Sequence, residues 1–134
     1  MPNSHTEVYL HLVWATWDRL PLITLEIEKP LYDCIRTRCR DMHTHILAIG
    51  GNYDHVHILI RMTATKSIAE VVGDIKGASS HFVTHELNHV EFQWQGAYSA
   101  FSVDNSGLES LMNYIENQKK HHQEKTLREG WELH

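Results

Sequence analysis

The sequence predicts an α+β protein built on a ferredoxin-like antiparallel sheet, with helices on one face and an additional C-terminal helix. Along the chain, residue patterns follow the order strand, helix, strand, strand, helix, strand and helix. The first six of these form the β-α-β-β-α-β unit that is typical of ferredoxin-like folds. The 134 residues fit a single domain over 1–134, and the 42% apolar content is enough to bury a core.

The expected strands are rich in aromatic and β-branched residues, as the first one (EVYLHLVWAT) illustrates. They span residues 7–16, 44–50, 55–62 and 98–103. Gly50, Gly51 and Asn52 are expected to form the turn between the two middle strands, because glycine and asparagine favour turns.

The expected helices span residues 24–42, 67–84 and 108–128. Thr24 is a plausible N-cap of the first helix, and Ser67 with Glu70 three positions later predicts a capping box at the second. The turn Asp104–Gly107 precedes the third helix and is rich in residues that tolerate several backbone conformations.

Composition narrows the functional classes. No apolar run is long enough for a membrane span, the N-terminus lacks the pattern of a secretory signal, and Cys34 and Cys39 are too few for a disulfide framework. A cytoplasmic protein is therefore expected. The net charge of −5 argues against a general nucleic-acid coat, so a DNA enzyme of this charge would need a local basic stripe or a metal ion.

Two histidines mark the strand 55–62. Because side chains alternate along a strand, His55 and His57 point to the same face of the sheet, about 7 Å apart. They can converge on one cation, or they can be two solvated histidines. Asp54, just before them, is either a turn residue or a group that orients an imidazole.

Tyr114 and Gln118 lie four residues apart on the last helix and therefore share a face. Either residue alone is ordinary: the tyrosine borders an apolar stripe and the glutamine fits a helix surface. Together they offer a phenol nucleophile beside a neutral oxygen ligand. A phenol is a weak nucleophile at neutral pH, and a metal ion that polarises a phosphoryl group compensates for this.

These motifs resemble the single-tyrosine transposases of the HUH superfamily, which include insertion-sequence transposases and REP-associated tyrosine transposases. The resemblance covers nearly the whole chain, and its segments are HLVWATWDRLPLIT, GGNYDHVHILI, FQWQGAYSAFSV and LMNYIENQKKHH. By position, Tyr114 matches the nucleophile of the family, and His55, His57 and Gln118 match its metal ligands.

The resemblance implies a DNA transposase that holds Mg²⁺ or Mn²⁺ and cuts single-stranded DNA at hairpin-flanked element ends. Cleavage would proceed through a 5′-phosphotyrosine intermediate, and a 3′-OH would reverse it to rejoin the strands. A homodimer is also expected, because the apolar stripe of the last helix needs cover. In the family this helix can dock on the other subunit, which would place Tyr114 in trans to the histidines of its partner.

Basic and polar side chains near these motifs are candidate DNA contacts: Lys76, Ser80, Lys119, Lys120 and His121. The alternative for the group after Gln118 is a favourable interaction with the helix dipole. A ladder of His81, His85 and His89 at spacing four could hold a metal, although a solvated face is the simpler interpretation.

Two other functions stay open at this point. One is a metal-dependent nuclease or phosphodiesterase that activates water at the same histidines, with a structural Tyr114. The other is a ferredoxin-like nucleic-acid-binding module without catalysis. A covalent protein–DNA adduct would separate the transposase from both.

Overall fold

The protein is described by a computed structural model over residues 4–119 and residue 132, and its α+β fold class confirms the prediction. Four antiparallel strands lie in the order β2-β3-β1-β4, which is the ferredoxin-like order. The strands are β1 (Tyr9–Ala15), β2 (His45–Asn52), β3 (His55–Arg61) and β4 (Ser99–Val103). The central pair, β1 and β3, therefore carries side chains that are covered on both faces.

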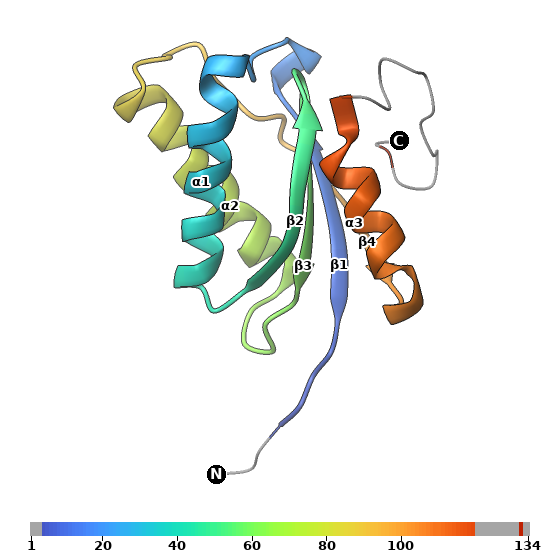
Figure 1. The fold of residues 1–134 in the computed structure, drawn as a ribbon. Coiled ribbons are helices and arrows are strands. Elements are labelled where there is room, and N and C mark those ends of the chain that lie inside the picture. Colours follow the sequence, from blue (N-terminus) through green and yellow to red (C-terminus); the bar gives the residue numbers. More distant parts are fainter. Residues whose placement is uncertain (1–3, 120–131, 133–134) are drawn as a thin grey trace.

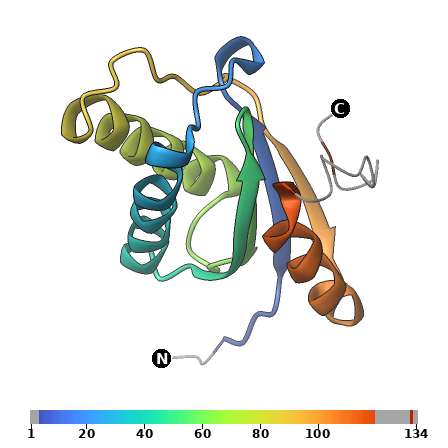
Figure 2. The same cartoon turned by 45° about the horizontal axis from the view of Figure 1, so that its top comes forward.

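Helices cover both faces of the sheet, as Figures 1 and 2 show. The helices α1 (Leu25–Asp41) and α2 (Ile68–His81) pack on one face, and α3 (Leu108–Glu116) packs on the other. Residues 120–128 of the expected last helix lie outside the described residues. None of the described helices is long and apolar enough to cross a membrane.

Alternation along the strands divides the interior into two apolar clusters. On β3, Val56 and Ile58 point toward α1 and α2 and belong to the larger cluster, with Trp14 of β1 beside them. Leu59 points the other way and joins a smaller cluster under α3. The members of this smaller cluster are Ala48, Leu59, Leu111, Tyr114 and Ile115. His55 and His57 have the same parity as Leu59, so they face α3.

The helix N-termini follow the sequence signals in part. The capping box of α2 is confirmed: the Ser67 hydroxyl accepts from the Glu70 amide at 3.1 Å, and the Ser67 amide donates to the Glu70 carboxylate at 2.9 Å. Thr24 occupies the N-cap of α1, but its side chain makes no capping hydrogen bond. Beyond α2, the chain continues as a π-helical turn, η2 (Phe82–Glu86), so the regular helix ends three residues before the expected boundary.

The predicted turn at Gly50, Gly51 and Asn52 is wrong. Strand β2 continues through all three residues, with Asn52 paired to His55, and the turn is formed by Tyr53 and Asp54. The glycines serve close backbone approach instead. A Cβ on Gly50 would lie 1.9 Å from the carbonyl oxygen of Ile115 in α3, and one on Gly51 would lie 2.2 Å from the His55 carbonyl oxygen.

Candidate active site

The two histidines of β3 lie together under α3. Their ring centroids are 5.0 Å apart with an interplanar angle of 72°, and both side chains are buried. His55 lies at the start of the strand and His57 two residues further, opposite Ala15 and Val13 of β1. Small or short neighbours on this face of β1 leave room for the imidazoles to turn toward α3.

Helix α3 brings Tyr114 and Gln118 onto these histidines. The Tyr114 ring stands edge-on to His57, with centroids 6.1 Å apart, and is only 3% exposed. Gln118, one turn later, places its Oε1 atom 3.3 Å from Nε2 of His55. The amide Nε2 of Gln118 donates to the Tyr114 carbonyl at 3.4 Å, which turns Oε1 toward the histidine. The four residues that the sequence pattern selected therefore meet at one place.

The close fit of α3 depends on Gly50 of β2. The strand pairs Gly50 with His57, and the Ile115 backbone of α3 lies directly against the glycine. Ile115 sits between Tyr114 and Gln118 in the sequence, so this contact sets the height of both side chains above the histidines. A glycine in the strand thereby fixes the geometry of residues on the helix.

Asp54 orients His55, which was one of the two interpretations of that carboxylate. Its Oδ1 lies 2.7 Å from Nδ1 of His55, and its Oδ2 accepts from Nε of Arg19 at 3.2 Å. Partial burial alone would raise the pKa of Asp54, but its hydrogen bonds and electrostatic interactions with His55 and Arg19 lower it. The carboxylate therefore stays ionised and holds the Nδ1–H of His55, which leaves Nε2 facing Gln118.

The structure adds two residues to the site that the sequence pattern did not select. The first is Glu132, whose Oε1 lies 3.3 Å from Nε2 of His57 and 3.7 Å from Nε2 of His55. Its other oxygen accepts a hydrogen bond from the Tyr114 hydroxyl. Burial alone would raise the pKa of Glu132, but His57 and Tyr114 stabilise the carboxylate and lower the pKa to about 2. No periodicity or motif marks this position in the sequence.

The second is His11 of β1, whose Nε2 lies 2.8 Å from Nδ1 of His57. The two rings are stacked, with centroids 5.0 Å apart and an interplanar angle of 19°. Burial, and then the charge of His57, lowers the pKa of His11 to about 3, so its ring is neutral near pH 7. A sequence signal did exist here, because His11 is a polar residue inside an otherwise apolar strand.

Comparison with known proteins places this arrangement in a family. The family model described as "Transposase IS200 like" matches residues 4–118, which include every strand and all four residues that the sequence selected. The chain belongs to the IS200-like transposase family. No curated protein sequence matches this family member.

Two solved structures are similar to this family member. One is a candidate transposase from Deinococcus radiodurans R1, with a TM-score of 0.71 and 25% identity, covering 88% of this chain and 98% of that chain. The other is a REP-associated tyrosine transposase bound to a REP hairpin, with a TM-score of 0.61 and 18% identity, covering 98% of this chain and 76% of that chain. The second likeness concerns the fold alone.

Among the residues expected to contact DNA, the two described lysines already hold protein partners. The Lys76 ammonium donates to the carbonyls of Gln95 and Ala97 and so fastens the loop before β4. Lys119 forms an ion pair with Glu28 of α1. Ser80 is half-buried on α2, and Lys120 and His121 lie outside the described residues. A role of these residues in DNA binding stays a prediction.

The histidine ladder does not gather into a second metal ligand set. His81 and His85 stack with centroids 4.4 Å apart, but His89 turns to the carboxylates of Glu26 and Glu91, at 3.7 and 3.4 Å. Within the described part of the chain, the metal-ligating side chains that converge within 4.8 Å are those of His55, His57 and Glu132.

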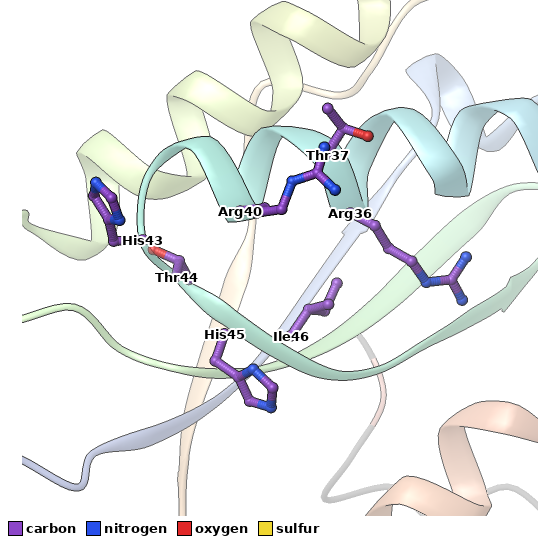
Figure 3. A pocket seen from close by; sticks show the side chains of 7 residues that line it. All are labelled: Arg36, Thr37, Arg40, His43, Thr44, His45 and Ile46. Carbon is purple, nitrogen blue, oxygen red and sulfur yellow. The ribbon is translucent and has the colours of Figure 1, made fainter.

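A basic pocket of about 550 Å³ lies at the other end of the sheet, between the end of α1 and the start of β2 (Figure 3). Arg36 and Arg40 come from α1, and His43 and His45 come from the turn and the strand that follow. The side chains that line it include no acid. His45 pairs with Arg61 whereas Asn52 pairs with His55, so the pocket is roughly 20 Å from the histidine site along the strands.

Proposed function

We propose that this protein cleaves and rejoins single-stranded DNA, with Tyr114 as the nucleophile and a divalent metal ion at His55, His57 and Gln118. The observation that carries the proposal is the meeting of α3 with β3. The phenol stands against His57, and the Gln118 carbonyl oxygen lies 3.3 Å from Nε2 of His55. Family membership supports the same chemistry.

The donor atoms at this place suit a cation. Asp54 holds Nδ1–H of His55, so a neutral ring turns the lone pair of Nε2 toward Gln118 Oε1. At 3.3 Å these two acceptors need a cation between them, which is either a proton on Nε2 or a metal ion. Nε2 of His57 and the Glu132 carboxylate complete a set of two nitrogens and two oxygens. Mn²⁺ accepts such a mixed set, and Mg²⁺ prefers oxygen, so both ions fit with Mn²⁺ favoured.

The metal ion, when bound, would polarise the scissile phosphate and orient it toward the phenol. The Tyr114 hydroxyl loses its proton and its oxygen forms a bond to phosphorus, while the bond from phosphorus to the 3′ oxygen breaks. The 3′ oxygen takes up a proton, and the 5′ phosphate stays on the tyrosine. Attack by another 3′-OH reverses these changes, so the phosphate bond is conserved and the DNA is rejoined.

Binding of the DNA phosphate backbone requires positive charge on this acidic protein, and the side chains of the basic pocket offer it. Arginines and threonine hydroxyls are common phosphate contacts, and the pocket contains Arg36, Arg40, Thr37 and two histidines. We propose that the backbone of a DNA hairpin lies in this pocket while its single-stranded flank reaches the histidine site. The expected homodimer stays a prediction as well. In the described chain the stripe of α3 is covered by the protein's own sheet, with Leu111 and Ile115 buried.

Replacing Arg36 and Arg40 by alanine is expected to weaken hairpin binding and to reduce the slope of log affinity against log salt by up to about 2. Fluorescence anisotropy at several salt concentrations measures this. A Lys29→Ala and Lys66→Ala double variant removes the same charge outside the pocket and should change the slope less. Equal slopes for the two double variants would place the hairpin elsewhere.

The chemistry is tested with Tyr114→Phe, which removes one oxygen from an otherwise unchanged ring. We expect the variant to bind hairpin-flanked single-stranded oligonucleotides like the wild type and to form no covalent adduct with Mn²⁺ present. A denaturing gel with 5′- and 3′-labelled strands reads both results. Cleavage without an adduct in the wild type would favour the water-activated nuclease, and an adduct that persists in the variant would remove Tyr114 from its role.

A further inference from the structure

A third histidine lies inside the sheet behind the proposed metal site. His11 of β1 is 0% exposed, and its strand neighbours are Leu59 on β3 and Phe101 on β4. Phe101 packs on the imidazole at a centroid distance of 5.8 Å. An apolar side chain could fill this position without burying polar atoms. Burial of an imidazole removes its ring nitrogens from water, so a polar contact inside the protein is needed to offset that cost.

A hydrogen bond joins this ring to His57. Nε2 of His11 lies 2.8 Å from Nδ1 of His57, an ordinary hydrogen-bond distance between two buried nitrogens. The other ring nitrogen, Nδ1, has no hydrogen-bond partner among the described residues. His11 also lines a pocket of about 330 Å³ between β4 and the start of α3.

We propose that His11 is a positioning residue for the metal site, and the proposal rests on the function proposed above. Its Nε2 accepts the Nδ1–H of His57, which fixes the ring and the tautomer of His57. The lone pair of His57 Nε2 is then directed toward His55 Nε2 and the oxygens of Gln118 and Glu132.

The two ligating histidines are thereby oriented by different groups. His55 donates to the carboxylate of Asp54 at 2.7 Å, whereas His57 donates to a neutral imidazole. An outer hydrogen bond of this kind holds a metal ligand in its binding orientation, and its loss typically weakens metal affinity about ten- to a hundredfold. His11 contributes to the site without touching metal or DNA.

The test is calorimetric titration of the full chain with Mn²⁺. His11→Phe keeps a planar ring and removes the acceptor, and we expect it to bind Mn²⁺ about ten- to a hundredfold more weakly than the wild type. His11→Gln restores a carbonyl acceptor near the position of Nε2 and is expected to recover most of the affinity. His57→Ala is the reference for loss of a ligand, and His85→Gln, at an exposed position of the π-helical turn, is the control for loss of a histidine elsewhere.

Binding of Mn²⁺ at wild-type affinity by a folded His11→Phe variant would overturn the proposal. So would a His11→Gln variant that is folded but as weak as the Phe variant. Failure of the DNA chemistry alone is recognised separately: the wild type would then bind Mn²⁺ with the expected dependence on His11 and yet form no adduct.

A second measurement does not depend on the folding of any variant. Nitrogen-15 NMR of the histidine rings, with saturating Mg²⁺ as a diamagnetic ion, reports the tautomer of each ring. The proposal requires a proton on Nδ1 of His57 and none on Nε2 of His11. A proton on Nε2 of His11 would reverse the hydrogen bond and refute the assignment.

Discussion

Gly50→Ala adds one methyl group at the contact between β2 and α3. The new Cβ would lie 1.9 Å from the Ile115 carbonyl oxygen and 2.9 Å from its carbonyl carbon. Backbone rather than a flexible side chain is in the way, so α3 itself has to move. Because Ile115 lies between Tyr114 and Gln118, any movement of the helix is transmitted to the proposed nucleophile and to a proposed ligand.

The size of the movement follows from the contact. Carbon and oxygen approach to about 3.3 Å without a clash, so the carbonyl must retreat by roughly 1.4 Å. A misplacement of about 1 Å in a catalytic constellation can reduce the rate about a hundredfold. Overpacking of this kind typically destabilises a fold by about 1–3 kcal/mol. We therefore expect a loss of cleavage that is much larger than the loss of folded protein.

The assay is single-turnover adduct formation on a hairpin-flanked oligonucleotide with Mn²⁺, beside a urea unfolding curve. Gly73→Ala is the matched control, because Gly73 is exposed on α2 with no atom within 4 Å of the added Cβ. It should cleave at the wild-type rate and gain about 0.5–1 kcal/mol in unfolding free energy. Wild-type cleavage by Gly50→Ala would show that α3 does not rest on Gly50 in the active state.

Two further predictions concern the assembly and the pH dependence of the protein. Because α3 packs on its own sheet in the described chain, mixing Tyr114→Phe and His57→Ala chains should restore no cleavage; recovery in a verified heterodimer would show that the helices exchange between subunits. The pKa of buried His11 falls from 6.5 to about 3 on folding, so the unfolded state binds the extra proton in that window. The free energy of unfolding that is present above pH 6.5 should therefore fall progressively as the pH is lowered toward 3. Urea unfolding at pH 7 and pH 4.5 should show a smaller decrease for His11→Phe than for the wild type.

Much of the fold could be predicted because local patterns and the long-range structure agree. The capping box at Ser67 starts α2, and the alternation of Val56, His57 and Ile58 separates the helix-covered face from the site face. Gly50 and Gly51 were misassigned because a glycine needed for close approach looks, in sequence, like a glycine needed for a turn. The contacts of the folded chain distinguish the two: Gly50 lies against the Ile115 backbone of α3, and Gly51 lies against the His55 carbonyl of β3.

The site divides in the same way. Tyr114 and Gln118 share a helical spacing, so their common face is readable from the sequence, as is the common face of the two histidines on β3. Glu132 lies at the site, but no periodicity or motif in the sequence marks it. His11 could have been noticed as a polar residue in an apolar strand, but its partner follows only from the register of β1 against β3.

The unequal size of the two apolar clusters has a consequence for how the protein opens. Most of the buried side chains hold α1 and α2 on the sheet, whereas α3 is held by the five-residue cluster around Leu59. Segments with few buried contacts exchange their amide hydrogens through local opening, at a free energy below that of global unfolding. We therefore expect α3 to behave as a separate unit in hydrogen exchange, with its amides exchanging before those of β1 and β3. Helix α3, with the proposed nucleophile, could then leave and return while the histidine-bearing strands stay folded.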